Sequence, residues 1–160
     1  MTSELLTRRG LLTSASAGLI AGAIGPVYAK GLSITPTMRG GANNYIPGAP
    51  IVDRIGSGGF LMQGTVRRAE DGVPLPGRRI QVWAHTTEGH ERDPQSHGAT
   101  LTDVNGVFQL DMPQIVPAFG QAHGHLAYDD DGEYKTVFLR PLMSSPKVNS
   151  LTVDFVLTRV

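Results

Sequence analysis

The sequence predicts an all-β fold, an antiparallel β-sandwich of about seven short strands. Two observations predict it: the apolar runs after Gly59 are short, and residues typical of turns separate them. A third is that no stretch after residue 29 is a convincing helix. A chain of 160 residues corresponds to one modest domain.

The first 29 residues look like a twin-arginine export signal. Arg8-Arg9 precede an uncharged, apolar run over residues 10–26, which is too short to be a comfortable membrane span. Ala29 and Val27 occupy the −1 and −3 positions of a cleavage site. We expect a signal peptide over 1–29, recognised by the twin-arginine export machinery, and a periplasmic or secreted mature chain that does not span a membrane. The alternative is an uncleaved anchor.

The segment after the signal has several Gly and Pro and little periodicity, so residues 30–59 are expected to form an extended arm or an irregular loop. The sandwich then occupies residues 60–160. Its expected strands are 60–66, 79–84, 100–103, 107–110, 122–128, 134–139 and 151–159.

Turns and alternation support these strands. Asn105-Gly106 supplies the positive φ that a tight turn needs, which predicts a hairpin between 100–103 and 107–110. A second hairpin is expected between 122–128 and 134–139, across Gly132. The last strand alternates cleanly, with Leu151, Val153, Phe155 and Leu157 directed to the core.

Composition excludes several classes of function. The chain carries 14 basic and 14 acidic residues, which argues against a nucleic-acid partner because binding phosphates needs clustered Lys and Arg. It has no Cys, which excludes disulfides, thiolate metal sites and a cysteine nucleophile. A bound metal would therefore need His, carboxylate or Tyr ligands, and the candidates are the five His: His85, His90, His97, His123 and His125.

His123-Gly124-His125 has the spacing of a metal-binding pair. Residues two apart on a strand point to the same side, about 6.5 to 7 Å apart, so both imidazoles can converge on one ion. Gly124 between them leaves room on the opposite face. The alternative is that both imidazoles are partly exposed polar groups on an edge strand.

Six pieces occur in a fixed order through the middle of the chain: 64–66, 71–77, 80–83, 102–108, 123–125 and 135–139. This set resembles the intradiol ring-cleavage dioxygenases, which act on catechol and protocatechuate, over about residues 60–141. The earlier turn and strand pieces are also similar to transthyretin-like and carboxypeptidase-regulatory sandwiches. Trp83, expected in the core between the sheets, and the His-Gly-His sequence favour the dioxygenases.

The resemblance implies a mononuclear iron site held by the His pair and two Tyr. This sequence departs at both Tyr positions, because Glu91 stands where the first Tyr is expected and Phe119 is the aromatic residue nearest to the second. No Arg stands just ahead of the His pair, where residues 120–122 are Gly, Gln and Ala, whereas the family places there an Arg that helps to position the substrate. A set of imidazoles and a carboxylate suits Fe(II), Cu(II), Zn(II) or Mn(II) better than Fe(III).

The candidate metal ligands are therefore His123, His125, His90 and Glu91, with His85 and His97 near enough in sequence to join them. The alternative for His85, His90 and His97 is that they belong to a solvated loop, since residues 86–97 are polar throughout.

Three functions follow. The first is a dioxygenase-like oxidoreductase that uses O2 and a small aromatic diol, with iron as the metal that the resemblance favours and copper, zinc or manganese as alternatives. The second is a non-catalytic periplasmic module that binds a metal or another ligand. The third is a transthyretin-like interaction domain without metal. The arm over 30–59 also suggests association into a homo-oligomer, because many members of the family associate through such arms.

Overall fold

The computed structural model describes residues 31–129 and 132–160. The predicted export signal over 1–29 lies outside these residues. Within the described ranges, no helix has the length and apolar character needed to cross a membrane. The only helix assigned there is a single 3-10 turn, η1 (Pro94–Ser96), so the described chain is all β, as predicted.

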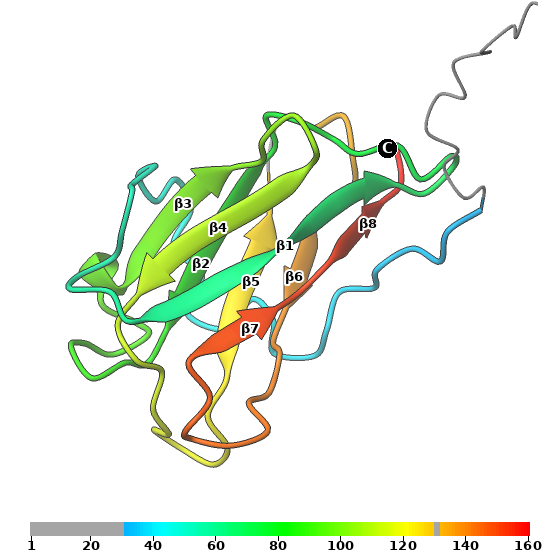
Figure 1. The fold of residues 1–160 in the computed structure, drawn as a ribbon. Helices are drawn as coiled ribbons and strands as arrows, with labels where there is room; N and C mark the ends of the chain where they lie inside the picture. The colour runs from blue at the N-terminus through cyan, green and yellow to red at the C-terminus, as the bar shows by residue number, and fades with distance from the viewer. Residues whose placement is uncertain (1–30, 130–131) are drawn as a thin grey trace, which may run out of the picture.

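Two sheets form the sandwich (Figure 1). In the first sheet, β1 (Phe60–Arg68) pairs with β4 (Val107–Met112), β7 (Ser150–Thr152) and β8 (Phe155–Leu157). In the second sheet the order is β3 (His97–Leu101), β2 (Arg79–Ala84), β5 (Gly124–Tyr128) and β6 (Val137–Leu139). Most pairs are antiparallel, but β7 and β8 run parallel to β1, so the first sheet is mixed.

The core lies between the two sheets and is built from alternate residues of each strand. On β1 the buried members are Phe60, Met62 and Val66, and on β5 they include Leu126 and Tyr128. Gly64 continues the β1 series where the chain passes closest, because a Cβ there would lie 1.8 Å from the carbonyl oxygen of Val153. This close approach requires glycine.

The hairpin predicted between 100–103 and 107–110 is wrong. β3 pairs with β2 and β4 pairs with β1, so the chain crosses from one sheet to the other at this point. The tight turn itself is present, with Gly106 at φ 72° and its N–H donating to the carbonyl of Asp103. The same turn chemistry serves a crossing between sheets as well as a hairpin.

The second hairpin and the alternation of the last strand are as predicted, although the strands have other lengths. β5 and β6 pair antiparallel, with Leu126 opposite Leu139, as the second hairpin predicted. The last strand keeps its alternation, since Phe155 and Leu157 are buried and Thr152 is exposed. It divides into β7 and β8 because the Asp154 carboxylate accepts hydrogen bonds from the backbone N–H and the hydroxyl of Thr65, each at 2.8 Å.

The arm, defined here as the described residues 31–59, has turns and isolated bridges but no strand. It meets both edges of the second sheet: Met38 N–H donates to Phe138 O on β6, and Val52 N–H donates to Ala99 O on β3. The arm therefore passes over the outer face of this sheet, the face turned away from β1 and β4.

Candidate metal centre

The site is built on the outer face of the second sheet. On β2 and β5, Val82 and Leu126 belong to the core, so Trp83 and His125, one position along each strand, point to the other face. Trp83 is fully buried, but it lies on the outer face of this sheet rather than between the sheets, which corrects the sequence-based expectation.

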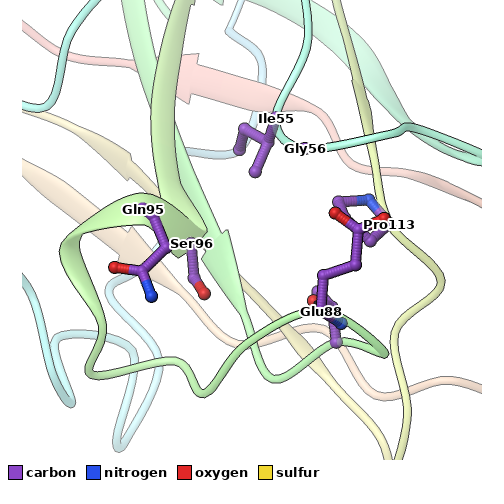
Figure 2. Close-up of a pocket in the computed structure, with 7 residues that line it drawn as sticks. Ile55, Gly56, Glu88, Gln95, Ser96 and Pro113 are labelled. Carbon is purple, nitrogen blue, oxygen red and sulfur yellow. The ribbon is translucent and has the colours of Figure 1, made fainter.

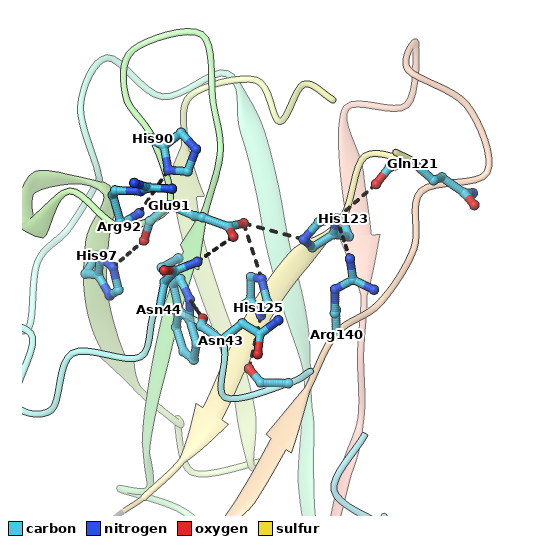
Figure 3. Close-up of polar contacts among 12 residues, drawn as sticks. Asn43, Asn44, His90, Glu91, Arg92, His97, Gln121, His123, His125 and Arg140 are labelled. Atoms are coloured by element: carbon cyan, nitrogen blue, oxygen red, sulfur yellow. Dashed lines mark hydrogen bonds and ion pairs between the residues drawn. The ribbon is translucent and has the colours of Figure 1, made fainter. Parts of the chain in front are cut away.

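Three predicted ligands lie together there. Oε2 of Glu91 is 3.3 Å from Nε2 of His125 and 3.4 Å from Nε2 of His123 (Figure 3). The ligand atoms of this group all lie within 4.8 Å of one another. Glu91 comes from the loop between β2 and η1, and the two imidazoles come from β5 and the residue before it. Strand periodicity brings the imidazoles together, with Gly124 between them facing inward against Met62.

His125 presents an unprotonated nitrogen to this group. Its Nδ1 lies 3.0 Å from the carbonyl oxygen of Gly41, and because a carbonyl only accepts, Nδ1 carries the proton and donates it. Burial lowers the pKa of His125, since the charged form loses its hydration, so the neutral ring is favoured. Nε2 is therefore a lone pair, buried and without a hydrogen-bond partner among the described residues.

The ring of His123 is oriented in the same way. Its Nδ1 donates to the carbonyl oxygen of Gln121 at 2.9 Å, which leaves Nε2 directed at Glu91. Oε2 of Glu91 is likewise buried without a hydrogen-bond partner in the described part of the chain. The buried lone pair of His125 thus faces a buried carboxylate oxygen with no hydrogen bond between them, an arrangement that is costly unless a cation lies between the two atoms. The residues fit a metal ion.

Trp83 and His97 hold two members of this group in place, because Trp83 stacks on His125 and His97 contacts the backbone of Glu91. The rings of His97, Trp83 and His125 stack on three neighbouring strands, with centroids 5.4 and 5.1 Å apart and planes within 7°. Nε2 of His97 donates to the carbonyl oxygen of Glu91 at 2.7 Å, and burial lowers the pKa of His97. His97 therefore fixes the backbone of Glu91 instead of joining the ligand group.

His90 and His85 lie outside the group of three. Their rings contact each other edge to face, with centroids 4.9 Å apart, and Nδ1 of His90 accepts from the backbone N–H of Arg92. The structure thus brings together three of the four residues proposed from sequence as metal ligands and separates the fourth, His90, from them.

The described tyrosines do not replace the missing phenolates. Tyr128 and Tyr134 belong to the core cluster. Tyr45, on the arm, donates its hydroxyl proton to Asp129. Burial and that carboxylate raise the pKa of Tyr45 to about 12, so its side chain is a neutral phenol at physiological pH. Phe119 is 81% exposed.

Two polar side chains near the group carry no signal in the sequence. Asn44, on the arm, donates from Nδ2 to Oε1 of Glu91 at 2.6 Å. Arg140 follows β6, and its Nη2 lies 3.5 Å from Nδ1 of His123. Nε of Arg140 is buried without a hydrogen-bond partner, and no carboxylate within 31–129 and 132–160 forms an ion pair with this residue. Both contacts join residues that are distant in the sequence, so no local sequence pattern predicts them.

A separate cavity of about 150 Å³ lies beside the 86–89 turn (Figure 2). Its lining includes Glu88, Ser96 and Pro113 but none of the three converging residues. Both carboxylate oxygens of Glu88 already accept hydrogen bonds from Ser57. The cavity is smaller than the several hundred Å³ usual for a ligand pocket.

The described chain is thus a two-sheet β-sandwich that carries two imidazoles and a carboxylate on the outer face of one sheet. No protein-family model matches the sequence, and no curated protein sequence matches it. Solved structures do match. The hydroxyquinol 1,2-dioxygenase of Pseudomonas putida DLL-E4 is 16% identical, with a TM-score of 0.61 over 82% of this chain and 68% of that one. The dioxygenase domain of a carbohydrate-binding fusion protein from Streptomyces sp. SirexAA-E is 17% identical, with a TM-score of 0.60 over 80% of this chain and 100% of that one.

Catechol 1,2-dioxygenase from Pseudomonas arvilla C-1 is also similar, at 16% identity and a TM-score of 0.56, over 84% of this chain and 62% of that one. The chain therefore has the fold of the intradiol dioxygenases, which confirms the resemblance found in the sequence.

Proposed function

We propose that Glu91, His123 and His125 hold one divalent transition-metal ion. One observation carries this proposal: the buried lone pairs of His125 Nε2 and Glu91 Oε2 face each other at 3.3 Å without a hydrogen-bond partner among the described residues. Two imidazoles and one carboxylate are the ligand set of non-haem Fe(II) oxygenases. Iron is the metal that the family resemblance favours, and copper, zinc and manganese are the alternatives.

We further propose that the protein is an oxidoreductase that acts on a catechol-like aromatic diol with O2. The solved structures with this fold are named as catechol, chlorocatechol and hydroxyquinol dioxygenases. When bound, the metal would supply Lewis acidity and redox chemistry toward the diol and O2. Three protein ligands leave further positions on the ion for the two substrates.

The charges around the group favour an anionic ligand. A divalent ion and the Arg140 guanidinium together bring three positive charges, against the single negative charge of Glu91. Side chains of the group are 0 to 14% exposed, so solvent screens this excess weakly. A deprotonated diol would balance it, and Arg140 stands close enough to His123 to take part in orienting such a ligand.

A second candidate is a non-catalytic module that binds a metal or another ligand. The observation that favours it is the loss of both tyrosine positions that the resemblance implies, since Glu91 replaces one phenolate and the exposed Phe119 is nearest to the other. Under this second candidate function, the protein has lost ring-cleaving chemistry and has kept the metal site.

Elemental analysis followed by oxygen uptake tests both candidates. We expect one equivalent of transition metal in the purified protein, lost in the His123→Ala, His125→Ala double variant and kept in His90→Ala. Oxygen uptake with a panel of catechols would then support the enzyme. A protein that binds one metal ion but consumes no oxygen with any diol of the panel would support the non-catalytic module. A protein that takes up no stoichiometric metal would contradict the enzyme and the metal-binding form of the module.

The place of action is also a proposal. We infer export by the twin-arginine machinery from Arg8-Arg9 and the apolar run after them, followed by action in the periplasm or outside the cell. Fractionation of cells that express the wild-type chain and an Arg8→Lys, Arg9→Lys variant would test it, because only the wild type should leave the cytoplasm.

A further inference from the structure

We propose that the tip of the arm, residues 41–44, is a working part of the metal site and that Asn44 is a positioning residue for Glu91. The proposal rests on the metal site proposed above. It assigns a role to a segment that is nearly 50 residues away in sequence from Glu91 and more than 75 away from the His pair.

Asn44 decides which oxygen of Glu91 is available. Its amide donates to Oε1 at 2.6 Å, so one oxygen of the carboxylate is engaged and turned toward the arm (Figure 3). The other, Oε2, remains without a hydrogen bond among the described residues and faces both imidazoles. Asn44 thereby presents Glu91 as a ligand with a single oxygen.

Two backbone carbonyls of the same tip orient the rest of the group. Gly41 O accepts the Nδ1 proton of His125 at 3.0 Å, which fixes the tautomer that leaves Nε2 free. Asn43 O accepts from the indole N–H of Trp83 at 2.9 Å, and Trp83 stacks on His125. Three of the four residues of the tip therefore take part: Gly41 and Asn44 contact two of the three ligands directly, and Asn43 supports His125 a second time through Trp83.

The tip has little freedom to shift. A Cβ on Gly41 would lie 2.6 Å from the carbonyl oxygen of Phe138, so glycine allows the arm to lie directly against β6. Met38 N–H donates to the same carbonyl at 2.8 Å. Asn44 has φ 57°, a left-handed conformation that asparagine tolerates better than most residues. The carbonyls and the amide are therefore held at fixed positions over the site.

This arrangement couples the arm to the metal. An ion that binds Oε2 and both Nε2 atoms strengthens the contacts of Glu91 and His125 with the arm, and by reciprocity a docked arm raises the affinity for the ion. Loss of an outer partner of a metal ligand typically lowers metal affinity by about 10- to 100-fold.

Two asparagines provide a matched test. Asn44→Gly removes the amide and keeps the left-handed backbone accessible. Asn149→Ala removes the side chain of an exposed asparagine that lies just before β7, in the other sheet and outside the metal site. The Kd for Co²⁺ would be measured by competition with a chromophoric chelator, and the visible spectrum of the Co²⁺ protein would be recorded. We expect Asn44→Gly to weaken Co²⁺ binding about 10- to 100-fold. We expect it also to weaken the visible bands, because Oε1 becomes free to bind and raises the coordination number. Asn149→Ala should behave as the wild type.

A second measurement follows the arm itself. Arg39 is exposed and lies just before the tip, so trypsin cleavage after it reports release of the arm. Co²⁺ should slow this cleavage in the wild type and in Asn149→Ala, and should slow it much less in Asn44→Gly. The melting temperature of the metal-free variants shows that each is folded.

The outcomes separate the two proposals. A wild type that binds no Co²⁺ overturns both the metal site and the role of the arm. A wild type that binds Co²⁺, with Asn44→Gly equal to it in Kd, spectrum and protection from trypsin, overturns only the role of the arm.

Discussion

Replacing Glu91 by glutamine is expected to move two properties of the protein in opposite directions, because the metal-free site holds acceptors that face one another. Oε2 of Glu91 lies 3.3 Å from Nε2 of His125 and 3.4 Å from Nε2 of His123. A glutamine side chain places an N–H donor where Oε2 now lies, while its oxygen stays available to the amide of Asn44. The metal-free Glu91→Gln protein should therefore be more stable than the wild type.

The magnitude follows from the contacts. Satisfying a buried acceptor that lacks a partner is worth about 1–3 kcal/mol. Part of that gain is lost because the hydrogen bond from Asn44 no longer ends on a charged oxygen, which costs about 1 kcal/mol. The free energy of unfolding should rise by up to about 2 kcal/mol, which corresponds to an increase of up to about 8 °C in melting temperature for a domain of this size.

Metal affinity should change the other way. Glutamine lacks the charge and is a poor metal ligand, so the Kd for Co²⁺ should rise by more than about 100-fold, which is the upper limit for loss of an outer partner alone. Thermal unfolding with excess chelator and then with Co²⁺ measures both effects, since a ligand that binds only the folded state raises its stability. The wild type should gain more from Co²⁺ than the variant.

Glu88→Gln is a matched control, because both oxygens of Glu88 already accept hydrogen bonds from Ser57. That variant should lose stability slightly and keep its Co²⁺ affinity. A lower melting temperature for metal-free Glu91→Gln would refute the reasoning, because it would show that Glu91 is stabilised there by a protonated imidazole and not opposed by a neutral one.

Three further predictions concern single residues. Gly124→Ala would place a Cβ 2.7 Å from Cε of Met62, and urea unfolding should show a loss of about 1 kcal/mol; an unchanged midpoint would show that Met62 yields freely. Tyr45, whose folded pKa is raised to about 12, should remain a neutral phenol at pH 11 in an ultraviolet titration. Its contribution to stability is fully present below pH 10 and is lost as the pH rises through about 12, and ionisation near pH 10 would contradict its contact with Asp129. If the protein oxidises catechols, Arg140→Met should raise KM about tenfold, as expected for a lost ionic contact of about 1–2 kcal/mol, and Arg140→Lys should restore part of it; an unchanged KM in Arg140→Met would exclude a role in binding.

Features with a local cause could be predicted from the sequence. The period of a strand determined the alternation of Phe155 and Leu157 and placed His123 and His125 on one side, and both are as predicted. The position of Glu91 came from the family resemblance, and the structure places its carboxylate against both imidazoles.

Features with a distant cause could not be predicted. Asn105-Gly106 specifies a tight turn, but whether the strands on either side pair depends on β2 and β1, which capture β3 and β4 into different sheets. The contacts of Asn44 and Arg140 depend on where the arm and β6 lie over the outer face. Backbone carbonyls such as that of Gly41 orient the site, and a carbonyl has no signature in a sequence.

The ligand set proposed for this protein is electrically consistent with a lower metal charge than that of the set which the family resemblance implies. A ferric ion with two tyrosinates and two neutral imidazoles, the set that the family resemblance implies, has a net charge of +1. A divalent ion with Glu91, His123 and His125 also has a net charge of +1, because one negative ligand and one unit of metal charge are lost together. Tyr45 adds nothing to this balance, since it is held as a neutral phenol by Asp129. The proposed ligand set thus favours a divalent ion in a pale protein, and a strong reddish colour from ferric tyrosinate would show that a tyrosine has entered the site.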